Sequence, residues 1–214
     1  MIGVIKGDII ASRKLTDQDK WLLPLKNLLA QWGKTPEQWE LVWGDFFQVE
    51  FEDPEEALRK ALAIKVLIKK IAPLNERKKI STIDVRIGIG IGEKTYSGVK
   101  ISESNGSAFI HAGERFDALK KEKITMGIKS PWSLFDEEIN LYLKLAGTFM
   151  DKWTISSAEL IHAVLQNNTY TQEEIGKLLG IKQSGVSGRW NRANVEEIME
   201  VEKMYRKKIK KLLS

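Results

Sequence analysis

The sequence predicts an α+β protein, in which an antiparallel sheet with helices on one of its faces is followed by an all-helical module. Three observations support this prediction. Segments rich in β-branched residues alternate with helical segments up to about residue 130, and helical periodicity alone continues from there. In addition, 43% of the 214 residues are hydrophobic, which is enough for a substantial core. We therefore expect one mixed domain and one smaller module.

The chain begins with a predicted strand and a predicted helix. Residues 2–12, IGVIKGDIIAS, are rich in isoleucine and valine, as strands are. Residues 16–33 have helical character, with Thr16 and Asp19 at the spacing of a capping box and Gly33 as the expected end.

A hairpin and a second helix follow. Residues 39–52, WELVWGDFFQVEFE, predict two strands joined by a tight turn at Gly44-Asp45. Residues 53–73 predict a helix, because Asp53 is a good N-cap and is followed by proline at the first helical position.

The next segments complete a recognisable order. In residues 81–94, isoleucine and valine alternate with other residues, and glycines at 88, 90 and 92 predict a close approach of another backbone. Residues 106–121 predict an amphipathic helix, and residues 123–130 a further strand. The order β-α-β-β-α-β-α-β is typical of the ferredoxin-like plan, with helices on one face of an antiparallel sheet.

Two carboxylates interrupt apolar strand segments. Asp8 lies within the first strand, and Asp45 lies in the hairpin turn. A carboxylate among apolar residues is costly unless it is paired, although Asp45 beside glycine is also a common turn residue. The ferredoxin-like plan makes the first strand and the hairpin neighbours, so we expect Asp8 and Asp45 to meet at one sheet edge. Two such carboxylates suit a hard divalent cation such as Mg²⁺ or Mn²⁺, which prefers oxygen ligands and brings phosphates with it.

Four motifs in this order carry a family resemblance. They are DIIAS at 8–12, WGDFFQV at 43–49, VRIGIGIG at 85–92 and GSAFIHAGERF at 106–116. Together they resemble the catalytic core of class III nucleotidyl cyclases. With its helical C-terminus, the whole chain resembles the bacterial SatD family. The resemblance implies a cyclase-like domain over residues 1–131, a connecting helix over 132–150 and a DNA-binding module over 151–214.

The resemblance also implies site residues, and the sequence departs from some of them. Asp8 and Asp45 match the metal ligands, while Glu103, His111 and Arg115 stand at nucleotide-binding positions. The lysine that reads the purine is replaced by Leu41, and the usual asparagine is replaced by His111. We therefore expect metal and nucleotide binding without efficient catalysis. An active cyclase, or a related two-metal phosphoryl-transfer enzyme, is the alternative, and a cyclase fold serving only as a dimer platform is a third interpretation.

Residues 170–194 predict a helix-turn-helix. Thr171 and Glu174 have capping-box spacing, and Gly180 allows the turn. The pattern is similar to helix-turn-helix segments of bacterial regulators, although such a module also occurs in protein-binding domains. The residues expected to contact DNA are Lys182, Gln183, Ser184, Ser187, Arg189 and Arg192. An apolar stripe along residues 195–214 favours a homodimer.

Charge and composition are consistent with a cytoplasmic DNA-binding regulator. Residues 171–214 hold ten Lys/Arg and six Asp/Glu, a net charge of +4 out of +5 for the whole chain. This asymmetry favours an anionic partner. The chain has no cysteine and no apolar run of about 18 residues, so we expect neither disulfides nor a membrane span. The sequence thus predicts a nucleotide- and metal-sensing transcriptional regulator.

Overall fold

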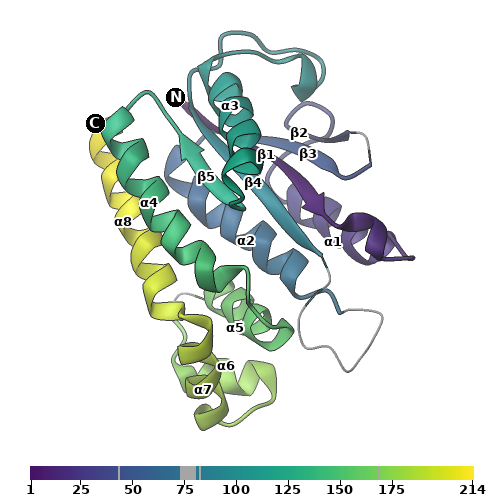
Figure 1. Cartoon of the computed structure of the whole chain (residues 1–214), viewed down its shortest axis with the longest axis vertical. Helices are drawn as coiled ribbons and strands as arrows, with labels where there is room; N and C mark the ends of the chain where they lie inside the picture. The colour runs from purple at the N-terminus through teal and green to yellow at the C-terminus, as the bar shows by residue number, and fades with distance from the viewer. Residues whose placement is uncertain (43, 73–80, 82, 168) are drawn as a thin grey trace.

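A five-stranded mixed sheet forms the centre of the protein, with the strands in the order β2–β3–β1–β4–β5 (Figure 1). The structure is a computed structural model, and it describes residues 1–42, 44–72, 81, 83–167 and 169–214. The strands are β1 (Ile2–Ile10), β2 (Trp39–Val42), β3 (Phe46–Phe51), β4 (Asp84–Gly92) and β5 (Met126–Lys129). β1 is antiparallel to β3 and to β4, and β2 is antiparallel to β3.

The described helices fall into two groups. The first three are interleaved with the strands, and the other five follow β5 without interruption. They are α1 (Asp19–Ala30), α2 (Ala57–Lys69), α3 (Ser107–Glu122), α4 (Ser133–Met150), α5 (Ile155–Gln166), α6 (Gln172–Leu179), α7 (Gln183–Ala193) and α8 (Val195–Leu213), with short 3₁₀ turns η1 (Ser12–Lys14), η2 (Pro54–Glu56) and η3 (Ile101–Glu103). Each helix in the described part of the chain falls short of the length and apolar character that crossing a membrane requires.

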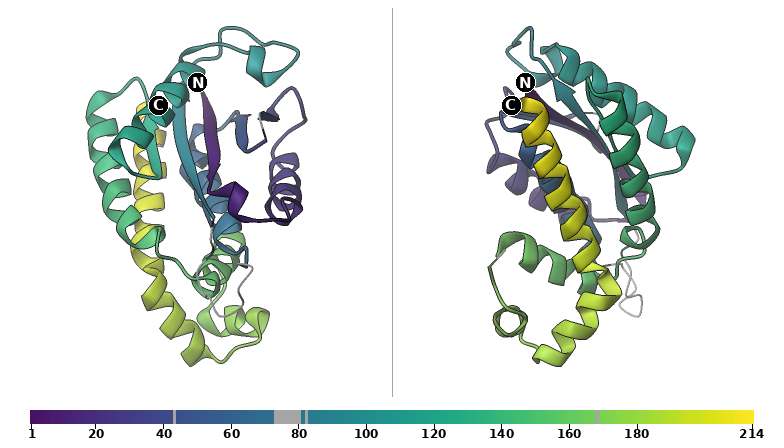
Figure 2. Two further views of the ribbon diagram at one scale, coloured as in Figure 1. Left: turned by 45° about the vertical axis from the view of Figure 1, so that its right-hand side comes forward. Right: turned by 90° about the vertical axis from the view of Figure 1, so that its left-hand side faces the viewer.

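The sheet differs from the predicted one in two respects. β5 is parallel to β4, so the sheet is mixed and not purely antiparallel. Helices also cover both of its faces, as Figure 2 shows with α3 on one side and α1 on the other. The glycines of β4 allow α3 to pack on this second face, because they have no side chain to keep the helix away. An added Cβ at Gly90 would lie 2.1 Å from the Ala108 carbonyl oxygen of α3, which is too close for any other residue. The close approach predicted from these glycines is confirmed, and it brings α3 directly onto the sheet.

The opposite face of the sheet holds most of the hydrophobic core. Ile5 and Ile9 of β1 and Ile87 and Ile89 of β4 are buried there with residues of α1 and α2. The same cluster continues into the C-terminal helices, where Ile175 is buried. The described helices that follow the sheet therefore pack onto it through a shared core.

Several predicted boundaries can be compared with the structure. The hairpin is confirmed, because Val42 pairs with Phe46, although residue 43 lies outside the described residues. The Asp53 cap is also confirmed, since its carboxylate accepts a 2.8 Å hydrogen bond from the Glu55 backbone N–H. The cap at Thr16 is wrong: α1 begins at Asp19, after Gln18, with no side-chain cap. The second helix ends at Lys69, a few residues before the predicted end at residue 73, which itself lies outside the described residues.

The edge strand β5 is covered by a side chain of α4. The Ile128 N–H donates a 2.8 Å hydrogen bond to the Asn140 side-chain oxygen, and the Asn140 amide donates to the Ile128 carbonyl at 2.7 Å. Asn140 thus occupies the backbone groups that a further strand would use. This closes the sheet at this edge and aligns α4 with β5.

The last helix, α8, returns along α4 toward the chain termini (Figure 1). Its apolar stripe is buried within the same chain: Tyr205 is fully buried and donates a 2.7 Å hydrogen bond to the Pro54 carbonyl, and Ile209 is buried as well. Arg206 pairs with Glu56, which further fixes the helix to the start of α2. The stripe that favoured a homodimer is therefore explained by intramolecular packing.

Candidate functional site

Asp8 and Asp45 lie at the same end of the sheet centre. Asp8 is in β1, opposite Phe46 of β3 and Arg86 of β4 in the strand register. Asp45 immediately precedes β3, and its carbonyl accepts a 3.1 Å hydrogen bond from the Ile9 N–H. This backbone bond fixes the hairpin turn against β1. Both aspartates consequently line one hollow.

Each of these carboxylates has a protein partner. The Arg86 guanidinium donates to the two Asp8 oxygens at 3.3 and 3.1 Å. The Ser12 hydroxyl donates to Asp45 Oδ2 at 2.7 Å. Asp45 therefore accepts a neutral hydrogen bond, whereas Asp8 is held by a cation.

The electrostatics of Asp8 are set mainly by its position in the sheet. Burial raises the pKa of Asp8, and the Asp45 carboxylate raises it further. Arg86 and Lys120 act in the opposite direction without cancelling the effect. Ionised Asp8 is thus less stable here than in water, and a second cation near it would favour the ionised form.

The hollow is open and polar, with a volume of about 370 Å³. Its remaining lining comes from the segment after β1, including Arg13, and from Lys120 of α3. Ala11, also in the lining, has a φ of 61°, in the left-handed region that residues with a Cβ rarely adopt. Strained backbone of this kind is often found at functional sites. A neighbouring hollow shares Ser12, Arg13 and Asp45 and adds an apolar wall that includes Trp21.

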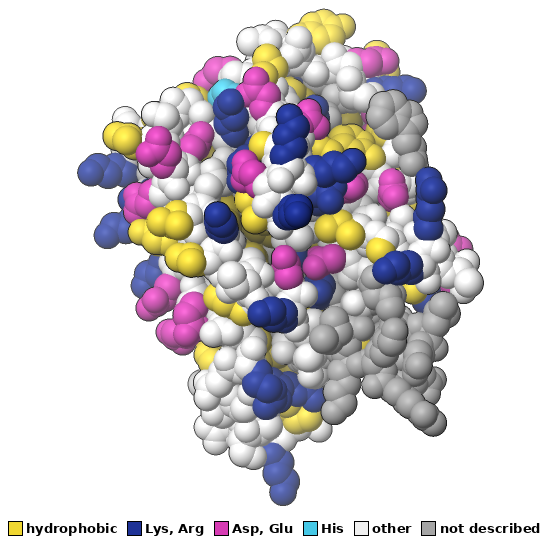
Figure 3. Space-filling view, in the orientation of Figure 1, with side chains coloured by type: hydrophobic (Ala, Val, Ile, Leu, Met, Phe, Trp, Pro, Cys, Tyr) yellow, Lys and Arg dark blue, Asp and Glu magenta, His cyan; other side chains and the backbone are white. Residues whose placement is uncertain are grey.

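Lysine and arginine side chains gather around this region of the molecule. Figure 3 shows them near the C-terminal end of α3, where Lys120, Lys121 and Lys123 are exposed. The positive electrostatic potential of these lysines favours the binding of an anion, such as a phosphate group, at the hollow.

The donor set is compatible with a magnesium ion bound together with phosphates. Mg²⁺ usually takes one or two protein carboxylates and completes its shell with water and phosphate oxygens. Asp8 and Asp45 would be those carboxylates, after Asp8 exchanges Arg86 for the ion. No group of three or more metal-binding side chains exists among the described residues, so a site made of protein ligands alone is not formed there.

The residues expected to bind the nucleotide lie outside this hollow. His111 is on α3, and its Nδ1 lies 2.7 Å from the Ile91 carbonyl oxygen. Because a carbonyl oxygen can only accept a hydrogen bond, the proton of the neutral ring is on Nδ1. Because Ile91 pairs with Gly3 and Arg86 with Asp8, His111 stands near the opposite end of β4 from Asp8. Sequence spacing along α3 alone did not reveal this separation.

Arg115 and Glu103 are also engaged elsewhere. Arg115 forms a two-bond ion pair with Glu122 of its own helix, at 2.9 and 3.0 Å, and its guanidinium covers Gly127 of β5. Glu103 is exposed in η3, where one carboxylate oxygen accepts a 3.3 Å hydrogen bond from the Lys100 N–H. The structure therefore brings the two predicted metal ligands together and leaves the three predicted nucleotide ligands apart from them.

Ser12, Arg86 and Lys120 line the hollow and were not among the predicted site residues. Ser12 and Arg86 lie within the motifs DIIAS and VRIGIGIG, so the motifs pointed to them without assigning a role. Lys120 follows Phe116 by one helical turn, and the Phe116 ring packs edge-on against Phe46 at 5.5 Å. Helical periodicity combined with the strand register is the signal that locates Lys120.

A second candidate site lies on α6 and α7. Thr171 and Glu174 form the expected capping box, and Gly180 ends α6 in the left-handed conformation. The buried Ile175 and Val186 hold the two helices together, and an added Cβ at Gly176 would lie 2.8 Å from the Ile181 carbonyl oxygen. Two adjacent helices are therefore fixed by a tight turn.

The predicted DNA-contacting residues are distributed over one side and the start of α7. Lys182, Gln183, Ser184 and Arg192 are exposed, and Ser187 is half-buried. Arg189 is half-buried as well and lies 3.4 Å from Glu159 of α5. Its charge is shared with that carboxylate, which the sequence analysis did not anticipate. The start of α7 therefore presents its polar side chains to solvent, while Arg189 is tied to α5.

Comparisons with known proteins add no assignment to either site. The chain matches no protein-family model, and no curated protein sequence matches it.

Proposed function

We propose that this protein is a DNA-binding transcriptional regulator of the SatD type, whose cyclase-like, ferredoxin-like domain senses a divalent cation together with a nucleotide. The observation that carries the proposal is the arrangement of α6 and α7, in which a glycine turn and a small core hold α7 so that its first residues face solvent. In a helix-turn-helix, the N-terminal residues of the second helix contact base edges. The proposed location is the bacterial cytoplasm.

In this proposal α7 is the recognition helix. Gln183 and Ser184 are exposed in its first turn, where they would reach base edges in the major groove. Lys182 and Arg192 are exposed cations that would contact phosphates on either side. Arg189 contributes less, because it already pairs with Glu159.

The sensing role is supported by the hollow at Asp8 and Asp45. Two carboxylates and the cations Arg86 and Lys120 line it together, which suits a metal ion bound with phosphates. When bound, the ion would neutralise the phosphate charge and the repulsion between the carboxylates. Arg86, released from Asp8, would be available for a phosphate oxygen.

DNA binding is tested by fluorescence anisotropy with a pool of genomic fragments over a range of salt concentrations. The logarithm of the affinity is expected to fall with the logarithm of salt concentration, with a slope of about −0.9 per phosphate contact. Arg192→Gln is expected to reduce the slope by about one unit, whereas Lys144→Gln, a change of an exposed lysine on α4, leaves it unchanged. The DNA-binding proposal fails if the full-length protein shows no salt-dependent binding.

The sensing site is tested by thermal unfolding with Mg²⁺ or Mn²⁺, with and without a nucleoside triphosphate. A ligand that binds only the folded state raises the melting temperature by mass action. We expect this rise in the wild-type protein and its loss in Asp8→Asn and Asp45→Asn. An equal rise in all three proteins would exclude the Asp8–Asp45 hollow as the metal site.

The alternative is an active nucleotidyl cyclase or a related phosphoryl-transfer enzyme, and the convergence of Asp8 and Asp45 in one hollow favours it specifically. We expect little cyclic product from ATP or GTP, because Leu41 and His111 replace groups that the cyclases use. His111 is moreover hydrogen-bonded to Ile91 and not directed to the hollow. Robust turnover that is abolished in Asp45→Ala would establish the alternative.

A further inference from the structure

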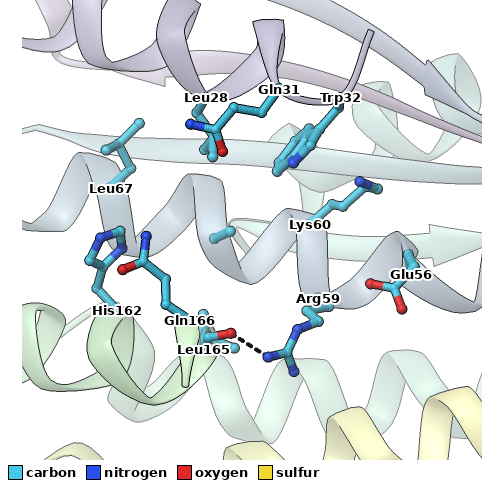
Figure 4. A pocket seen from close by; sticks show the side chains of 11 residues that line it. Leu28, Gln31, Trp32, Glu56, Arg59, Lys60, Leu67, His162, Leu165 and Gln166 are labelled. Carbon is cyan, nitrogen blue, oxygen red and sulfur yellow. Dashed lines mark hydrogen bonds between the residues drawn. The ribbon is translucent and has the colours of Figure 1, made fainter. Parts of the chain in front are cut away.

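A separate pocket lies between the sheet-bound helices and the first helix after α4. It is formed by α1, α2 and α5 and has a volume of about 200 Å³ (Figure 4). None of the residues predicted to bind metal, nucleotide or DNA lines it. It therefore requires its own explanation.

One end of the pocket is lined by the cations Lys60 and Arg59 and by the Glu56 carboxylate, which pairs with Arg206. The Lys60 ammonium lies 4.4 Å from the centre of the Trp32 ring, and no carboxylate in the described part of the chain lies within 4.0 Å of it. Burial lowers the pKa of Lys60, although nearby Glu56 and Asp53 raise it in part. Lys60 is thus a partly desolvated cation, held over an aromatic face without a direct counter-ion.

The second cation of the pocket, Arg59, is already engaged. Its guanidinium donates to the Leu165 carbonyl and lies 4.0 Å from Glu202. Among the described residues that line the pocket, Lys60 is therefore the one cation without a direct counter-ion. A ligand with a single negative charge matches this arrangement better than one with several.

The other end of the pocket offers neutral hydrogen-bonding groups. His162 and Gln166 are one helical turn apart on α5, and Figure 4 shows their side chains next to each other. Burial lowers the pKa of His162 to about 4, and the charge of Lys70 contributes, so its ring is neutral at neutral pH. A neutral imidazole offers one donor and one acceptor, and an amide offers both kinds of group.

The wall between these ends is apolar and includes Leu28, Leu67 and the Trp32 ring. The volume of about 200 Å³ lies below the range of about 300–1,000 Å³ typical for drug-sized ligands. We propose that this pocket binds a small planar aromatic carboxylate, with the carboxylate on Lys60, the ring against Trp32 and the leucines, and a polar ring substituent near His162 and Gln166.

The proposal is tested by isothermal titration calorimetry on the full-length protein, with benzoate and its three monohydroxy derivatives as probes. At least one of them is expected to bind at concentrations up to about 10 mM. Benzamide, which has the same shape without the charge, is expected to bind at least about tenfold more weakly, since a hydrogen bond to a charged group contributes about 1.5–3 kcal/mol.

Two substitutions test the charge of Lys60 and the volume of the pocket separately. Lys60→Gln is expected to weaken binding of the carboxylate about tenfold or more, while Lys26→Gln, at an exposed lysine of α1, leaves it unchanged. Ala63→Leu keeps every charge, fills the pocket and is expected to abolish binding. The proposal is overturned if no probe binds, if benzamide binds equally well, or if Lys60→Gln or Ala63→Leu binds as the wild type does.

Discussion

Two aspartate–cation pairs on neighbouring strands of this protein differ in what surrounds them. Asp84, at the start of β4, pairs with Lys65 at 3.0 Å and Lys69 at 3.3 Å, and the Lys65 side chain is fully buried. Asp8, in β1, pairs with Arg86 at 3.1 Å, and its side chain is 30% exposed at the edge of an open hollow. The ionic chemistry is similar, but the cation Lys65 is fully buried, whereas Arg86 and Asp8 are both partly exposed.

The Lys65 pair belongs to a network in which nearly every polar group is satisfied. Lys65 also donates to Asp151 at 2.6 Å and to Thr125 at 3.1 Å, and Lys69 donates to the Asp151 carbonyl at 2.7 Å. This network joins α2, β4 and the segment after α4. A buried cation with this many partners stabilises a particular packing, whereas a single pair beside a hollow can exchange its partner for a ligand.

The largest expected difference between the two regions concerns loss of the cation. Lys65→Met leaves this network short of its central charge and is expected to lower the free energy of unfolding by about 3 kcal/mol. Arg86→Met exposes Asp8 to water in the open hollow and is expected to cost about 1 kcal/mol or less. Urea-induced unfolding of the two variants beside the wild type measures both values.

A change at an exposed lysine calibrates this experiment. Lys26→Met removes an exposed lysine of α1 and is expected to change stability by less than about 0.5 kcal/mol. If Lys65→Met and Arg86→Met lower the free energy of unfolding equally, the Lys65 network does not contribute more to stability than the Asp8–Arg86 pair.

A smaller difference is expected for the hydroxyl groups that serve each region. Thr125 donates to Asp151 and Ser12 donates to Asp45, and both hydrogen bonds measure 2.7 Å. Thr125→Val is expected to cost about 2 kcal/mol, because Thr125 also accepts a hydrogen bond from the fully buried Lys65 ammonium, which then loses a partner. Ser12→Ala is expected to cost about 1 kcal/mol, since Asp45 faces a hollow that water enters. Equal losses in thermal or urea unfolding would show that solvent access does not separate the regions.

The sequence was a good guide where local patterns determine structure. Alternating isoleucines and glycines in β4 predicted both a strand and a close helix contact, and Asp53 and Thr171 predicted caps that the structure contains. The parallel pairing of β5 with β4 was missed, because strand direction depends on how a helix crosses over the sheet and not on the strand's own residues. The predicted cap at Thr16 is wrong because α1 starts later, after a loop in which the Gln18 amide donates hydrogen bonds to the Ser12 and Leu15 carbonyls.

The candidate site was predictable only in part for a similar reason. Asp8 and Asp45 were noticeable as carboxylates among apolar residues, and strand neighbourhood was enough to bring them together. The positions of His111 and Arg115 depend on how α3 is placed over β4 and β5, which sequence spacing does not encode. The pocket at Lys60 joins three helices that are distant in sequence, so no local motif marks it.

The smallest expected effect concerns the pH dependence of Asp8. Burial raises the pKa of Asp8 above 3.8, so as pH rises through 3.8 the unfolded chain ionises first and gains stability relative to the folded protein. Asp8→Asn cannot ionise and escapes this penalty. The variant is therefore expected to become more stable relative to the wild type between about pH 3 and about pH 7, by less than about 1 kcal/mol because Asp8 is partly exposed. Urea unfolding at both pH values, with Asp17→Asn as an exposed control, measures the change. A relative stability that stays constant with pH, or moves the other way, would show that the hollow does not strain the ionised carboxylate and would remove the main electrostatic reason for a cation to bind there.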